Sequence, residues 1–165
     1  MDVEREIAVS LRVRPDQARA LVGGVLGLVA EELWDHLGFE AERAFATEVP
    51  ELETWRVEAL RQLGQAGRTT YGEPRVREAL DAVWANHRGA ANPAPEGTAV
   101  NRMIDVLAPG IRAEDDDPRG PGRRVLTILV RFLHGRLSPT LFAQVLEVSP
   151  LLRRMAEPNH RPRGI

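Results

Sequence analysis

Apolar residues recur along most of this chain at every third or fourth position, which is the spacing of one face of an α-helix. Val3, Ile7 and Leu11 mark a first short helix in this way. The longest such pattern covers residues 15–37 and is followed by Gly38, a residue type that commonly ends helices. Strands would show alternating apolar and polar residues between turn signals, and the chain has no such run. We therefore expect an all-α fold with no sheet.

The same spacing, read together with helix-start signals, predicts about eight or nine helices in all. Ser138-Pro139 and Ser149-Pro150 are the strongest starts, because serine caps the first turn and proline fits its first position. Residues 115–122 combine aspartates with proline and glycine, so we expect an exposed loop there. The other helices are expected at residues 40–48, 50–63, 74–87, 100–107 and 123–136.

The chain also nearly repeats itself one hundred positions on. Leu33 matches Leu133 and Pro50 matches Pro150, and no gap is needed over residues 7–52. A fixed repeat of this kind is typical of a duplicated structural unit. We expect two related helical halves that pack face to face about a pseudo-twofold axis, since either half alone would leave one face of its long helix uncovered.

The length of 165 residues is usual for one domain. We expect a single compact domain, residues 1–165, that is built from the two halves. Its expected parts are a first helical repeat at 1–67, a connecting helix and Pro/Gly linker at 68–98, a second repeat at 99–158 and a flexible tail at 159–165.

Composition removes several kinds of chemistry. The chain has no cysteine, which excludes disulfides and thiolate metal sites. All 22 of its basic residues are arginine, so a lysine Schiff base is excluded as well. The first residues are unlike a signal peptide, and the longest apolar run, residues 21–30, is about half of a membrane span. We therefore expect a cytoplasmic protein that does not enter the membrane.

Charge is distributed unevenly, although the net charge is only -2. Residues 1–67 sum to -6 and residues 68–118 to -3, whereas residues 119–165 sum to +7. Three counterparts suit a basic C-terminal third: nucleic acid or another anion, the acidic first half of the same chain, and the acidic half of a neighbouring copy. We favour the two protein counterparts, because the chain as a whole is slightly acidic.

Three glycines lie inside the longest predicted helix, where each costs about 1 kcal/mol relative to alanine. Gly23 and Gly27 are four residues apart and share a face, which lets another helix approach closely. The approaching helix belongs either to the same bundle or to a second copy of the chain. Together with Gly24, Glu31 and Trp34, these are our candidate interface residues.

A polar stripe follows the second long helix. It is the stretch that diverges most from the corresponding part of the first half, so it is a natural place for a specific task. It is either a surface for an anion or an acidic partner, or an ordinary solvated face. Interleaved aromatic residues that would stack on bases are missing. The candidate residues are Arg123, Arg124, Arg131, His134 and Arg136, with Thr127 between them.

Catalytic and metal-binding motifs are not recognisable in this sequence. None of the four histidines forms an HxxE, HxxxH or HExxH pattern, and no Gly-x-Ser-x-Gly motif is present. Asp115, Asp116 and Asp117 lack the alternating ligands and the distal glutamate of a calcium loop. We therefore assign no catalytic residue, no metal and no cofactor.

Residues 136–153 carry a further motif: an arginine-leucine helix end, a Ser-Pro cap, a helix with a buried stripe, and then proline and leucines. This order resembles the repeated motif of a bacterial helical family catalogued as domain of unknown function 2267. Residues 45–52 look like a weaker copy of it. The resemblance implies a helical bundle and brings no established activity, so no functional residue is carried over.

These patterns favour a non-enzymatic helical adaptor, scaffold component or regulatory binding module that acts through protein–protein contacts and associates with itself. Two alternatives stay open. One is nucleic-acid or anion binding through the arginines of residues 119–163. The other is a small enzyme with a pocket between the halves, for which His134 and Glu31 are the first candidates.

Overall fold

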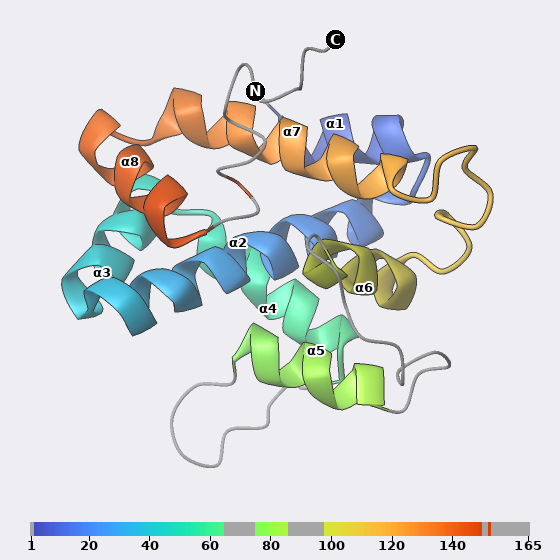
Figure 1. Ribbon diagram of the computed structural model, residues 1–165, viewed down its shortest axis with the longest axis horizontal. Coiled ribbons are helices and arrows are strands. Elements are labelled where there is room, and N and C mark those ends of the chain that lie inside the picture. Colours follow the sequence, from blue (N-terminus) through green and yellow to red (C-terminus); the bar gives the residue numbers. More distant parts are fainter. Residues whose placement is uncertain (1, 65–74, 86–97, 150–151, 153–165) are drawn as a thin grey trace, which may run out of the picture.

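The computed structural model describes residues 2–64, 75–85, 98–149 and 152, and these contain α-helices and no strand (Figure 1). The predicted all-α fold is therefore confirmed. In chain order the eight helices are α1 (Val3–Leu11), α2 (Pro15–Leu37), α3 (Phe39–Glu48), α4 (Leu52–Gln62), α5 (Val76–Ala85), α6 (Thr98–Leu107), α7 (Gly120–Arg136) and α8 (Pro139–Val148).

Helix α2 is the centre of the fold. Every residue from Ala20 to Glu31 is buried, so this part of the helix is covered on all sides. A helix that is apolar all round belongs in a core, which agrees with the leucine, valine, alanine and glycine content of this segment. The helices α1, α3, α4, α5, α6 and α8 all pack against it.

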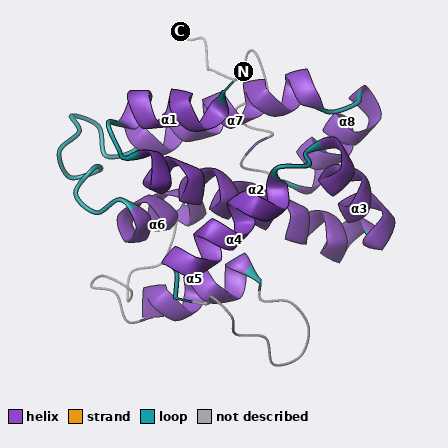
Figure 2. Cartoon of the chain, turned by 180° about the vertical axis from the view of Figure 1, so that it is seen from behind, coloured by secondary structure: helices purple, strands orange, loops and turns teal. Residues whose placement is uncertain are grey.

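The other helices surround α2 in a simple order (Figure 1). The helices α1 and α7 pack together above it, and α4 and α5 lie below. At the end where α2 finishes, α3 and α8 contact each other. Figure 2 shows the same order from behind, with α3 at one end of the long axis and the loop of residues 108–119 at the other.

Helix ends follow the local chemistry of the sequence. Helix α2 begins at Pro15, and its C-terminal cap is Gly38, whose φ of 93° favours glycine. Ser138 caps α8, because its hydroxyl oxygen accepts a hydrogen bond of 3.3 Å from the Leu141 N–H. The stop at Gly38 and the start at Ser138 were both expected from the sequence, and both are confirmed.

Several predicted boundaries are wrong by a few residues. Helix α7 begins at Gly120 and not at residue 123, because Pro121 fits the first helical turn, where a backbone N–H has no partner within the helix. The loop accordingly covers residues 108–119, of which Ala108 is buried and residues 116–119 are exposed. Helix α4 begins at Leu52 instead of 50, and α6 at Thr98 instead of 100. The start predicted at Pro150, most of the linker and the C-terminal tail lie outside the described residues.

The two long helices occupy different positions in the fold, although the bounds of α3 and α8 do differ by one hundred residues. Helix α2 is enclosed, whereas α7 buries one face and exposes Arg123, Thr127 and Arg131 on the other. The main neighbour of α2 is α4, and that of α7 is α1. The duplication and the domain limits stay predictions.

Candidate functional site

A groove of about 710 Å³ lies between α1 and the first half of α7 and is open to solvent. The two helices approach each other because both bury an apolar stripe, which contains Ile7 on α1 and Leu129 on α7. Their polar residues line the space that is left between them. The lining residues are Asp2, Arg5, Glu6, Val9, Ser10, Arg123, Arg124, Thr127, Ile128 and Arg131.

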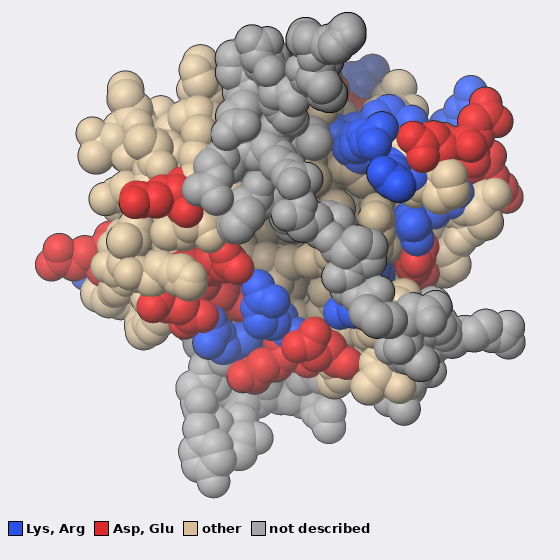
Figure 3. Space-filling view, viewed as in Figure 1, with Lys and Arg blue, Asp and Glu red and all other residues tan. Residues whose placement is uncertain are grey.

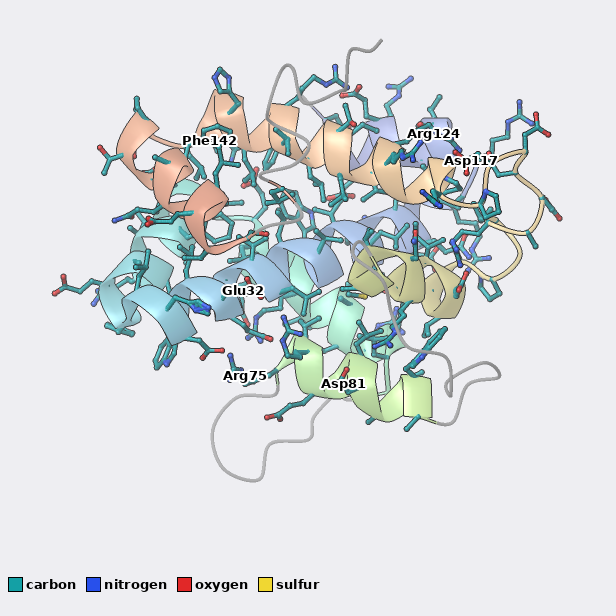
Figure 4. All side chains as sticks on the ribbon, in the orientation of Figure 1. Glu32, Arg75, Asp81, Asp117, Arg124 and Phe142 are labelled. Atoms are coloured by element: carbon teal, nitrogen blue, oxygen red, sulfur yellow. The ribbon has the colours of Figure 1, made fainter. Side chains whose placement is uncertain are left out.

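Four arginines line this groove against two carboxylates, so its lining has a positive balance. Arg131 pairs with Glu6 across the groove at 3.1 Å. Arg124 pairs with Asp115 at 3.0 Å, and Figure 4 shows Arg124 at the start of α7, beside the loop that follows α6. Arg5 forms no ion pair with any of the described residues. Its guanidinium is therefore the cation of this groove most available to a ligand.

The remaining ion pair at the groove is Arg123 with Asp117, at 3.4 Å. Both of these side chains are more than half exposed, at 56% and 53%. An exposed pair of this kind contributes only about 0.2–1 kcal/mol, because water and salt screen it. Such pairs open at low cost, so the groove arginines can exchange their present carboxylates for those of a ligand.

The groove also has an apolar part. Val9 is 70% exposed, the most exposed of the large apolar side chains in the described residues. It follows Arg5 by four positions, so the two side chains share a face of α1. Ile128 lies on the α7 side and is mostly buried. The groove therefore presents cationic and apolar groups together to a ligand. Val9 could not be predicted from the helical pattern of α1, because that pattern was used only to identify core residues.

Two residues of the predicted stripe, His134 and Arg136, lie outside the groove. The His134 ring contacts Phe142 of α8 edge to face, with ring centroids 5.2 Å apart. Arg136 donates two hydrogen bonds, of 2.7 and 3.1 Å, to the carboxylate of Glu51, and its guanidinium lies 4.9 Å from the centre of the Phe132 ring. The Arg136 hydrogen bonds lower the pKa of Glu51. Arg136 thus joins α7 to the start of α4 and is not free for an anion.

The basic C-terminal third does meet the acidic first half of its own chain. Arg131 and Arg136 pair with Glu6 and Glu51, which precede them by 125 and 85 positions. The Ser138 N–H adds a hydrogen bond of 2.7 Å to the Glu48 carboxylate. One of the two favoured counterparts, the acidic half of the same chain, is thereby confirmed for these residues.

The glycines of α2 are contacts within the chain, so the homodimer interpretation of them is wrong. Gly23 lies directly under the Trp55 carbonyl of α4, where a Cβ would overlap backbone atoms. A Cβ at Gly24 would lie 2.7 Å from the Met103 sulfur of α6, and one at Gly27 would lie 2.7 Å from a Val76 methyl of α5. All three glycines are buried and present nothing to a second copy.

Glu31 is structural as well. Its buried carboxylate accepts hydrogen bonds of 2.5 Å from the Val76 N–H and 3.1 Å from the Arg77 N–H, so it caps the N-terminus of α5. Burial raises the pKa of this carboxyl group, and the two hydrogen bonds oppose that change. Arg75, at 3.9 Å, is the nearest paired cation. Glu31 therefore joins α5 to α2.

Trp34 is exposed, unlike the other candidate interface residues. It keeps 49% of its surface accessible and contacts Phe39 of α3. Leu37 and Phe39 are also exposed, at 42% and 52%. We call these three residues, Trp34, Leu37 and Phe39, the α2–α3 corner. Of these three residues, only Trp34 was a candidate from the sequence. Leu37 and Phe39 are apolar residues next to the predicted end of the long helix, and this position could have indicated that they are exposed.

The described residues contain no group of three or more histidine and carboxylate side chains that would hold a metal ion. Within the same residues, no helix combines the length and apolar character that crossing a membrane requires. Searches against protein-family models, curated proteins and solved structures give no match to this chain. The likeness to domain of unknown function 2267 stays a prediction.

Proposed function

We propose that this protein is a helical adaptor, scaffold component or regulatory module that works by protein–protein contact and without catalysis. Its docking site is the groove between α1 and α7, and the segment it receives is acidic and amphipathic. The observation that carries this proposal is that Arg5 and Val9 share one open face of α1. A partner helix with glutamates beside leucines complements both groups at once.

The dimensions of the groove suit a short helix. Helix α1 has nine residues, which at the α-helical rise correspond to about 14 Å. A partner helix of about three turns would lie along the whole of it. Its carboxylates would take the place of Glu6 and Asp117 on the groove arginines, one carboxylate for another, at little electrostatic cost. Burial of Val9 would add the apolar part of the binding free energy.

Nucleic acid is a weaker candidate for this groove. A phosphate backbone offers no apolar surface for Val9, which is 70% exposed in the groove. A protein partner uses both the charged and the apolar groups.

A labelled synthetic peptide tests the proposal. The probe is an amphipathic helix of about three turns with glutamate and leucine faces, and fluorescence anisotropy reports its binding to the full chain. We expect micromolar affinity that weakens as salt rises. Arg5→Glu should weaken binding at least tenfold, whereas Arg61→Glu, the same charge change on α4, should leave it unchanged.

Two outcomes contradict this proposal. One is the absence of peptide binding at low salt. The other is tight binding of duplex DNA with a steep salt dependence, which would favour the nucleic-acid alternative. Circular dichroism of Arg5→Glu shows whether the variant is still folded. We expect it to be, because the Arg5 side chain is exposed and only the backbone N–H of Arg5 donates the hydrogen bond to the Asp2 carboxylate.

A further inference from the structure

The α2–α3 corner is an exposed apolar surface that is formed by three neighbouring side chains. Most large apolar side chains of the described residues are buried, yet Trp34, Leu37 and Phe39 together remain accessible. The Trp34 and Phe39 rings lie edge to face with centroids 5.4 Å apart, so they form one continuous surface. Adjacent exposed side chains of this size indicate a contact site, whereas a single exposed one needs no explanation.

Two exposed or partly exposed carboxylates lie beside this corner. Glu40 follows Phe39 in the first turn of α3 and is exposed. Glu147, near the end of α8, lines a hollow of about 420 Å³ together with Leu37. Neither glutamate forms an ion pair with any of the described residues. Arg43, whose guanidinium lies 5.8 Å from the centre of the Phe39 ring, is a cation at its edge.

The corner and the groove are opposite in charge and lie in different parts of the molecule. Figure 3 shows arginines gathered over the start of α7, with the carboxylates of the preceding loop beside them, and further carboxylates over the side where α2 and α3 meet. Figures 1 and 2 agree that α3 and the start of α7 lie toward opposite ends of the long axis. The corner of one molecule therefore has no access to the groove of that same molecule.

We infer that the groove between α1 and α7 receives the α2–α3 corner of a second copy, so that copies associate head to tail. Trp34 and Phe39 cover Val9, while Glu40 and Glu147 face the groove arginines, of which Arg5 is unpaired among the described residues. This inference rests on the proposed function of the groove and names its occupant. Because the two surfaces lie toward opposite ends of the long axis, a contact between two copies leaves one groove and one corner free, and the assembly adds further copies instead of stopping as a twofold dimer.

Sedimentation velocity of the full chain tests the inference. We expect the average sedimentation coefficient of the wild type to rise steadily from low to high micromolar concentration at low salt. High salt should return it to the monomer value, because the charged part of the contact is screened. Trp34→Ala removes the largest side chain of the corner and Arg5→Glu reverses a charge in the groove. Each variant alone should remain a monomer.

Matched controls separate this contact from a general loss of apolar surface or charge. Val57→Ala truncates another exposed apolar residue, 52% accessible, on α4. Arg61→Glu makes the same charge change away from the groove. Both controls should associate as the wild type does. Circular dichroism confirms that Trp34→Ala and Arg5→Glu keep their helices.

A mixture of the two deficient variants gives the sharpest test. The Arg5→Glu variant keeps an intact corner, and the Trp34→Ala variant keeps an intact groove. Mixed in equal amounts, they should form a one-to-one dimer that grows no further, because the two remaining surfaces are the altered ones. Together with continued growth of the wild type, this result distinguishes a head-to-tail contact from a closed dimer.

Three outcomes would overturn the inference: a wild-type chain that is monomeric at every concentration, association that neither variant disturbs, and a wild-type dimer that does not grow. The peptide assay distinguishes these from a failure of the proposed function. If the acidic peptide binds but the chain does not self-associate, the groove is a docking site for another protein. If neither occurs, both proposals are wrong.

Discussion

Replacing Gly23 with alanine is the most direct test of how α2 is enclosed. An ideal Cβ at this position would overlap the carbonyl carbon and oxygen of Trp55 and would lie 2.9 Å from the Arg56 nitrogen. These are backbone atoms of α4, so no side-chain rotation relieves the overlap. The two helices would have to separate by about 1–2 Å to reach ordinary van der Waals contact.

The expected cost follows from two opposing contributions. Overpacking a well-filled interior costs about 1–3 kcal/mol, and a backbone obstruction belongs at the upper end of that range. Alanine regains about 1 kcal/mol of helix propensity relative to glycine. The net loss is therefore about 2 kcal/mol of unfolding free energy, which for a chain of this size lowers the melting temperature by about 4–8 °C.

Urea denaturation followed by circular dichroism measures this change, and Gly135→Ala is its matched control. Gly135 lies in α7, is exposed, and has nothing within 4 Å of its ideal Cβ. Alanine there should stabilise the protein by about 0.4–1 kcal/mol. If Gly23→Ala were as stable as the wild type while Gly135→Ala behaved as expected, the close contact between α2 and α4 would be refuted.

Three further predictions concern polar contacts. Burial raises the folded-state pKa of Glu31 above its ordinary value of 4.5, so its contribution to stability falls as pH rises through the folded pKa. The wild type should therefore lose stability between pH about 4.5 and neutral pH, whereas Glu31→Gln, which has no carboxyl group to ionise there, should not. Urea titrations at several pH values measure the difference between their unfolding free energies. A difference that does not change with pH would contradict the buried carboxylate. A double-mutant cycle of Arg136→Gln with Glu51→Gln should give a coupling of about 0.5–1 kcal/mol that shrinks in high salt, and zero coupling would argue against the bidentate pair. Ser138→Ala should cost about 1 kcal/mol in thermal unfolding, since the Leu141 N–H loses its cap, and a neutral result would exclude that hydrogen bond.

The helices could be predicted from the sequence because their signals are local. Pro15 and Gly38 enclose the long apolar pattern of α2, and Ser138 precedes α8 with its serine-proline cap. The start of α7 was misplaced for an equally local reason. Pro121 and Gly122 look like loop residues, yet a proline in the first turn and a glycine that fits against Asn101 are both compatible with a helix.

The candidate site was harder to predict because it depends on which helices become neighbours. Arg124 and Arg131 of the predicted stripe line the groove, but only tertiary structure brings α1 beside them. The same applies to Arg136, whose partner Glu51 comes from the other half of the chain. The spacing of residues along one helix shows which side chains share a face, but it does not show which other helix packs against that face.

The enclosure of α2 has a consequence for biosynthesis. Helix α8, which covers the last part of α2, is made roughly one hundred residues after α2 itself. At ordinary translation rates this interval is on the order of 5 to 20 seconds, during which a long apolar helix is only partly sheltered. Helices α1, α3 and α4 are made by residue 62 and cover α2 first, so the part of α2 that packs against α8 is the last to be enclosed.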